Sequence, residues 1–127
     1  MENFQERRNL KRFTIPDAMV KYKQEEGFLG SMAVSGEGKL MNITVNAVRF
    51  ETQHVLIPGA VAILELNIKG KESIHVLGNI LWVSGAEEST SVNAMVQFFP
   101  FSTEHGHNPI ESKLQIEMLN KEFAREN

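Results

Sequence analysis

Cysteine is absent from this chain of 127 residues, and aspartate occurs only once, as Asp17. A chain without cysteine can form neither disulfides nor cysteine-ligated zinc sites, and it has no thiolate nucleophile. A single aspartate cannot supply the clustered Asp ligands that commonly hold magnesium or calcium. The composition therefore argues against phosphoryl-transfer enzymes, and we expect neither a metal nor another cofactor.

Long hydrophobic runs are also absent. No window approaches the roughly 18 uncharged apolar residues of a membrane span. Residues 1–15 are rich in charged side chains and lack the apolar stretch of a secretory signal. A hydrophobic content of 42% with 23% charged residues is ordinary for one globular domain. We therefore expect a soluble, cytoplasmic protein that does not insert into membranes.

The chain has no excess of positive charge, since 13 basic residues face 16 acidic ones and the net charge is -3. A nucleic-acid partner needs a basic field, and single-stranded binders also need a set of stacking aromatic residues. The aromatic residues here fall mainly at positions typical of a core. No nucleic-acid partner is expected, and any site for an anion must be local.

Alternating apolar and polar residues, together with a run at residues 61–68 that is apolar on both faces, predict six or seven short strands. The predicted strands cover residues 18–23, 28–34, 39–44, 47–52, 61–68, 74–82 and 92–98. Residues 35–38, with the sequence SGEG, are expected to form a turn. Strands at this spacing indicate a small antiparallel barrel over residues 14–107, because closure leaves no exposed edge strand. The expected fold class is all-β.

Residues 108–127 change to a helical period. Asn108 is a candidate N-cap, Pro109 suits the first helical position, and Glu111 completes an approximate capping box. The apolar positions of this helix are Ile110, Leu114, Met118, Leu119 and Phe123. We expect this face to pack across an open side of the barrel, with Leu114 and Met118 buried. A helix that binds a partner or forms a homodimer is the alternative.

Motifs for catalysis are missing. The chain has no G-x-S-x-G elbow, and its histidines fall outside the spacings of zinc enzymes. These histidines are His54, His75, His105 and His107. The segment SGEGK at residues 35–39 departs from a P-loop at two required positions. We therefore expect a protein that is not an enzyme.

The first 13 residues form a polar arm, expected to be flexible, that is locally basic through Arg7, Arg8, Lys11 and Arg12. Arg8 and Arg12 are four residues apart, a spacing that lets two guanidinium groups converge on one ligand. The planar guanidinium donates bidentately to phosphate oxygens and to the O6 and N7 edge of guanine. The arm therefore suits a guanine nucleotide, and a merely solvated arm is the alternative.

Two short strings carry a family resemblance. The R-x-x-x-R string from Arg8 to Arg12 and the later segment NITVNA (residues 42–47) resemble the two signatures of the PilZ domain, which are R-x-x-x-R and [D/N]-x-S-x-x-G. Residues 50–68, 80–83 and 94–101 are also similar to PilZ strands. The likeness covers residues 7 to about 101.

The resemblance implies a six-stranded antiparallel PilZ-like β-barrel that serves as a bacterial receptor for cyclic di-GMP. Arg8 and Arg12 would contact guanine edges and phosphates, and Asn42 would bind a guanine edge. Arg7, which precedes the signature, would face a second stacked dinucleotide. The full set implied by the resemblance is Arg7, Arg8, Arg12, Asn42, Thr44 and Ala47.

Two of these positions differ from the family pattern. Thr44 stands where the family usually has Ser, so the hydroxyl is kept. Ala47 stands where the family has Gly, which tolerates a positive φ and a close ligand. If the backbone is left-handed here, Ala47→Gly should relieve strain and tighten binding.

The expected output is mechanical. Ligand phosphates would order the basic arm and change the surface shown to a downstream protein partner. The alternative is a PilZ-like interaction module that binds no nucleotide and uses the helix at residues 109–124 or an exposed barrel face.

Overall fold

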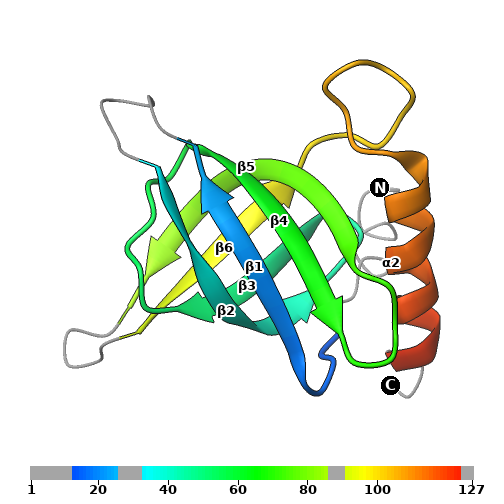
Figure 1. Ribbon diagram of the computed structural model, residues 1–127, viewed down its shortest axis with the longest axis horizontal. Coiled ribbons are helices and arrows are strands. Elements are labelled where there is room, and N and C mark those ends of the chain that lie inside the picture. Colours follow the sequence, from blue (N-terminus) through cyan, green and yellow to red (C-terminus); the bar gives the residue numbers. More distant parts are fainter. Residues whose placement is uncertain (1–12, 26–32, 86–90, 124–127) are drawn as a thin grey trace, which may run out of the picture.

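The computed structural model describes residues 13–25, 33–85 and 91–123, which form a barrel with one helix beside it (Figure 1). The elements in chain order are β1 (Ala18–Gln24), β2 (Val34–Ile43), β3 (Ala47–Thr52), β4 (Val61–Ile68), β5 (Ile74–Ser84), β6 (Val92–Phe98) and α2 (Ile110–Phe123). The strands pair antiparallel in the order β1-β2-β3-β6-β5-β4, and β4 pairs with β1 to close the barrel. The expected all-β fold, a six-stranded antiparallel barrel followed by a helix, is therefore confirmed.

The barrel consists of two three-stranded meanders, β1 to β3 and β4 to β6, in which consecutive strands pair. The meanders meet along two seams, where β3 pairs with β6 and β1 pairs with β4. At these seams Phe50 lies opposite Ala94, and Val20 lies opposite Leu66. All four side chains are buried, so both seams belong to the hydrophobic core.

The prediction for the start of β2 is wrong. The expected turn at residues 35–38 lies inside β2, which begins at Val34. Positions 36 and 38 require glycine because a side-chain carbon at either would clash with neighbouring atoms. A Cβ at Gly38 would lie 2.4 Å from the Glu51 carbonyl oxygen, and one at Gly36 would meet the Tyr22 hydroxyl. Residues 28–32 of the predicted strand lie outside the described residues, and the other strands occur where the alternation predicts them.

A polar cluster lies inside the barrel around Tyr22. Its ring stacks on Phe50 with centroids 5.2 Å apart. Its hydroxyl is hydrogen-bonded to Thr52 Oγ1 and, at 2.6 Å, to His54 Nδ1. Burial raises the pKa of Tyr22, and the hydrogen bond with Thr52 offsets part of that rise. The phenol is therefore held neutral in the folded protein at neutral pH.

We expect Tyr22 to ionise at a higher pH in the folded protein than in the urea-unfolded chain. Because the folded pKa is the higher one, the folded state keeps the proton longer. Its stabilising contribution is complete below the unfolded pKa of about 10 and is lost as the pH rises through the folded pKa. Tyr22 is the chain's single tyrosine, so ultraviolet absorbance of the phenolate measures it directly. Ionisation at or below the pH found in urea would contradict this expectation.

The helix is present, but its buried face differs from the prediction. Ile116 is fully buried, and Ser112 and Leu119 are nearly so. Leu114 and Met118, expected in the core, are 53% and 67% exposed. The buried stripe begins with a serine, whose hydroxyl donates to the His75 carbonyl oxygen of β5 at 2.9 Å. This hydrogen bond fixes the helix rotation, and hydrophobic periodicity does not reveal it.

Asn108 does not act as the predicted N-cap. Its side chain is fully buried, and Oδ1 accepts from the Leu77 N–H at 2.7 Å. The amide group donates to the carbonyl oxygens of Leu77 at 2.9 Å and Phe99 at 3.0 Å. Asn108 therefore ties the loop before α2 to β5 and to the segment after β6.

No helix in the described ranges is long and apolar enough to cross a membrane.

Phe13 marks where the N-terminal arm joins the barrel. Its ring is buried, and its backbone forms an antiparallel bridge with Ile43 through hydrogen bonds of 3.1 and 3.0 Å. Phe13, assigned to the arm from the sequence, is thus packed in the core. The rest of the predicted arm, residues 1–12, lies outside the described residues.

Candidate functional site

The second signature string, residues 42–47, ends β2 and begins β3. The Thr44 N–H donates to the Ala47 carbonyl at 2.8 Å. The Thr44 hydroxyl oxygen accepts from the N–H groups of Asn46 at 3.0 Å and Ala47 at 3.2 Å. Thr44 therefore holds the hairpin turn together, while its hydroxyl hydrogen remains available to a ligand.

A β-bulge in β2 turns the Asn42 side chain towards the outer face of the barrel. Leu40 and Ile43 are both buried, although they are three residues apart and strict alternation would place them on opposite faces. The pairing of β2 with β3 shifts between Leu40 and Asn42, which absorbs one residue. Asn42 and its partner Arg49 consequently lie side by side on the outer face, both half-buried. Asn42 presents an amide at the barrel surface, as a guanine-binding role requires.

The bridge between Phe13 and Ile43 places the last residue of the arm beside the turn at residues 42–47. Phe13 pairs with Ile43, which lies between Asn42 and Thr44. Arg7, Arg8 and Arg12 lie outside the described residues, so their positions remain predictions. Covalent geometry keeps the Cα of Arg12 about 3.8 Å, and that of Arg8 within about 18 Å, of the Cα of Phe13. The described residue nearest to the arginine motif in the sequence, Phe13, therefore lies beside the second signature.

The backbone at Ala47 is not left-handed. Asp17, with φ of 56°, is the single positive-φ residue other than glycine within the described ranges. Ala47 begins β3 and pairs with Gln97 of β6. The steric reason for preferring glycine here, a positive φ, is therefore wrong for this chain.

We expect Ala47→Gly to lower the free energy of unfolding by about 0.5–1 kcal/mol, because glycine in a strand loses more backbone entropy on folding. Urea denaturation measures this change. An increase in stability would show that alanine is strained at this position after all.

A row of four residues outside the core cluster crosses four strands beside the turn; three are half-buried and Met95 is buried. Asn42 of β2 lies opposite Arg49 of β3, Arg49 opposite Met95 of β6, and Met95 opposite Trp82 of β5. We call these four residues the outer row. Sequence reasoning did not single out Arg49, Met95 or Trp82 as candidate site residues. Alternation from Ala47 would place Arg49 on the same face, but only the strand order shows that it adjoins Asn42.

A hollow of about 720 Å³ adjoins the outer row on the side of β1. It lies where residues 14–19 pass residues 39–41 of β2. This volume is within the range of about 300–1,000 Å³ typical of ligand sites. The surface between residues 14–19 and residues 39–41 is therefore recessed.

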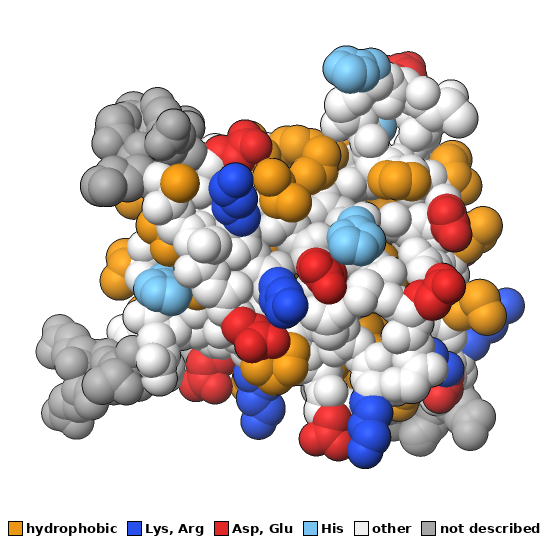
Figure 2. All heavy atoms as spheres, viewed as in Figure 1, with side chains coloured by type: hydrophobic (Ala, Val, Ile, Leu, Met, Phe, Trp, Pro, Cys, Tyr) orange, Lys and Arg blue, Asp and Glu red, His pale blue; other side chains and the backbone are white. Residues whose placement is uncertain are grey.

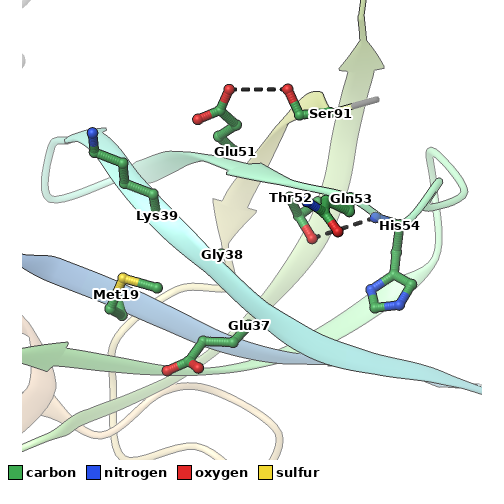
Figure 3. A pocket seen from close by; sticks show the side chains of 9 residues that line it. All are labelled: Met19, Glu37, Gly38, Lys39, Glu51, Thr52, Gln53, His54 and Ser91. Carbon is green, nitrogen blue, oxygen red and sulfur yellow. Dashed lines mark hydrogen bonds between the residues drawn. The ribbon is translucent and has the colours of Figure 1, made fainter. Parts of the chain in front are cut away.

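A second hollow, of about 550 Å³, lies further along β2 and β3 (Figure 3). Its walls carry the carboxylates of Glu37 and Glu51 and one ammonium group, that of Lys39. The Ser91 hydroxyl donates to Glu51 Oε2 at 3.0 Å. Two carboxylates against one cation disfavour an anionic ligand, so this hollow suits a nucleotide less well than the outer row does.

The face formed by β1 and β4 offers no anion site either. Figure 2 shows acidic and basic side chains interspersed over this side of the barrel. Lys21 of β1, for example, lies opposite Glu37 of β2 and Glu65 of β4. Charges of both signs cancel there, and the outer row remains the better candidate.

Comparison with known proteins supports the fold. No protein-family model matches the sequence, and no curated protein matches it. The solved PilZ domain of YcgR from Escherichia coli with c-di-GMP superposes with a TM-score of 0.63 at 12% identity, over 91% of this chain and 90% of that one. The Bacillus subtilis inhibitor of motility MotI/DgrA superposes with a TM-score of 0.59 at 9% identity, over 91% of this chain and 51% of that one. The described barrel, its helix and these superpositions together show that this chain has the fold of a PilZ domain.

Proposed function

We propose that this chain is a receptor or adaptor domain for cyclic di-GMP and not an enzyme. One observation supports the proposal: Phe13, the residue that follows the arginine motif in the sequence, is bridged to Ile43, between Asn42 and Thr44. The fold is also that of the YcgR PilZ domain, whose structure was solved with c-di-GMP. On this proposal the two signatures of the resemblance form one site.

Each proposed site residue has a distinct role. The Asn42 amide both donates and accepts, so it can bind a guanine edge, and the Thr44 hydroxyl donates beside it. Arg8 and Arg12 reach over the ligand from the arm and bind phosphate oxygens and guanine edges. Arg7 faces a second stacked dinucleotide, and Ala47 contributes its methyl group to the edge of the site.

Ordering of the arm is the proposed output. A ligand shifts a conformational equilibrium only through its different affinities for the two states. The arm carries the phosphate contacts, so the ligand favours the state in which the arm covers the barrel. A downstream protein in the bacterial cytoplasm would then bind the altered surface.

Calorimetric and thermal titration with cyclic di-GMP tests the proposal. At a free concentration about 100 times the Kd, binding to the folded state alone adds about 2.7 kcal/mol and raises the Tm by several degrees. GMP and GTP should act much more weakly. The absence of any heat or Tm change with cyclic di-GMP would refute the proposed function.

Arg12→Ala should weaken cyclic di-GMP binding about tenfold or more, because a charge-assisted contact contributes roughly 1.5–3 kcal/mol. Lys11→Ala is the matched control, since it removes a neighbouring cation that fits no signature position. The Tm without ligand should stay constant in both variants. Equal losses of affinity for Arg12→Ala and Lys11→Ala would mean that net charge, and not the signature, governs binding.

The alternative, an interaction module that binds no nucleotide, is favoured by one observation on α2. Ile110, Leu114 and Met118 expose 44%, 53% and 67% of their surface. A homodimer through this face predicts a concentration-dependent mass in sedimentation, which Leu114→Glu would abolish. Dimerisation together with no response to cyclic di-GMP would select this alternative.

A further inference from the structure

Arg49 is a cation on the outer row with no ion pair among the described residues. Its Nε is buried, and no hydrogen bond reaches that atom. Among the described residues, the ion pairs are those of Lys71 with Glu122 and His107 with Glu104, and neither includes Arg49. An unpaired buried donor is costly, because it loses its hydrogen bonds to water and gains none in the protein.

The neighbours of Arg49 explain why it remains unpaired. Its cross-strand neighbours are Asn42 and Met95, neither of which carries a negative charge. On its own strand the nearest outward-facing residues are Ala47 and Glu51. The Glu51 carboxylate accepts a hydrogen bond from the Ser91 hydroxyl, as Figure 3 shows. The barrel thus offers Arg49 no carboxylate partner of its own.

We propose that Arg49 is a ligand-binding residue that donates to a phosphate oxygen of the bound cyclic dinucleotide. This inference rests on the proposed function and extends it to a residue outside both signatures. Side chains directly opposite each other on paired strands have Cβ atoms about 4.5–5.5 Å apart. One ligand can therefore contact the Asn42 amide through a guanine edge and the Arg49 guanidinium through the adjoining phosphate.

The backbone position of Arg49 is set before a ligand arrives. It lies on β3, which pairs with β2 and β6 on its two sides. A cation held by a rigid sheet needs little further ordering on binding, whereas a residue on an arm must be ordered. Arg49 therefore supplies a preorganised charge to the site.

Trp82 offers an optical reporter of this location. It is the chain's single tryptophan and stands in the outer row two strands from Arg49, through Met95. Two strand spacings amount to about 10 Å. A cyclic dinucleotide bound at Arg49 should change the Trp82 fluorescence, and one bound in the Figure 3 hollow should leave it nearly unchanged.

The test compares Arg49→Met and Arg49→Lys with the intact chain. Methionine keeps an unbranched stem but has no donor, and lysine keeps the charge but lacks the planar fork. We expect Arg49→Met to weaken cyclic di-GMP binding at least tenfold in calorimetry and to abolish most of the Trp82 response. Arg49→Lys should bind with intermediate affinity. Without ligand, the Tm of Arg49→Met should equal or exceed that of the parent, because the unpaired donor is gone.

Lys21→Met serves as the matched control, since Lys21 is an exposed cation on β1, away from the outer row. Its affinity for cyclic di-GMP should equal that of the parent. Parent-like binding by Arg49→Met would overturn the inference and leave the proposed function standing. A lowered Tm of ligand-free Arg49→Met, with Arg49→Lys binding like the parent, would assign Arg49 to the fold and also overturn the inference. Failure of the intact chain to bind would overturn both.

Discussion

Asn108→Ala should lower the free energy of unfolding by about 2–6 kcal/mol. The substitution leaves the buried Leu77 N–H and Phe99 carbonyl without their Asn108 partners. Each unsatisfied group costs about 1–3 kcal/mol. The Leu77 carbonyl keeps a second partner, the Phe99 N–H at 2.9 Å, so it adds little. Urea denaturation followed by circular dichroism measures the change.

Asn79→Ala is the control for this prediction, because Asn79 is exposed on the same strand, β5. Its effect should stay within about 0.5 kcal/mol, as for most surface substitutions. Asn108→Asp provides a second comparison. It keeps an acceptor for Leu77 but turns a carboxylate towards the Phe99 carbonyl, so it should also be strongly destabilising. A loss below about 1 kcal/mol in Asn108→Ala would mean that water replaces the amide and that the loop is not anchored as described.

Ile116→Ala should cost about 2–5 kcal/mol, the usual range for truncating a buried aliphatic side chain. Ile116 is fully buried where α2 packs on the barrel, whereas Leu114 on the same helix is 53% exposed. Leu114→Ala should therefore change the stability by only about 0.5 kcal/mol. The pair is matched in size and chemistry and differs in burial. A larger loss for Leu114→Ala than for Ile116→Ala would show that the helix is rotated from the orientation described.

The barrel was predictable because its signals are local. In β4 and β5 inward and outward residues alternate, and each position contributes to the period independently of its neighbours. The failures occurred where a residue acts through a distant partner. Gly36 and Gly38 suggested a turn, but they make room for Tyr22 and for the Glu51 backbone. A glycine required for space and a glycine required for a turn look the same in a sequence.

The helix shows the same limit. Its apolar positions predicted a buried face with Leu114 and Met118, but a hydrogen bond from Ser112 to the backbone of β5 sets the observed rotation. Asn108 has the residue type and position of a helix cap, yet its amide binds β5 and the segment after β6. Such long-range hydrogen bonds depend on packing and leave no periodic signal.

Part of the candidate site could likewise be predicted from the sequence, and part could not. Asn42 and Thr44 were identified from a short string, and the bulge after Leu40 that turns Asn42 outward is visible only in the pairing. Arg49 lies outside the string, and its place beside Asn42 follows from strand register. The arginine motif itself remains a prediction, tied to the site through the covalent link to Phe13.

The outer row crosses the seam between the two meanders, and this has a consequence for folding. Asn42 and Arg49 belong to the first meander, and Met95 and Trp82 belong to the second. Joining them is a non-local event, the kind that makes barrels fold slowly. No half-assembled chain presents the complete row, so a ligand spanning it would recognise only the closed barrel. A bound ligand would then prolong the lifetime of the folded state. It would also slow amide hydrogen exchange where β3 meets β6, because it would hold the two meanders together at this seam.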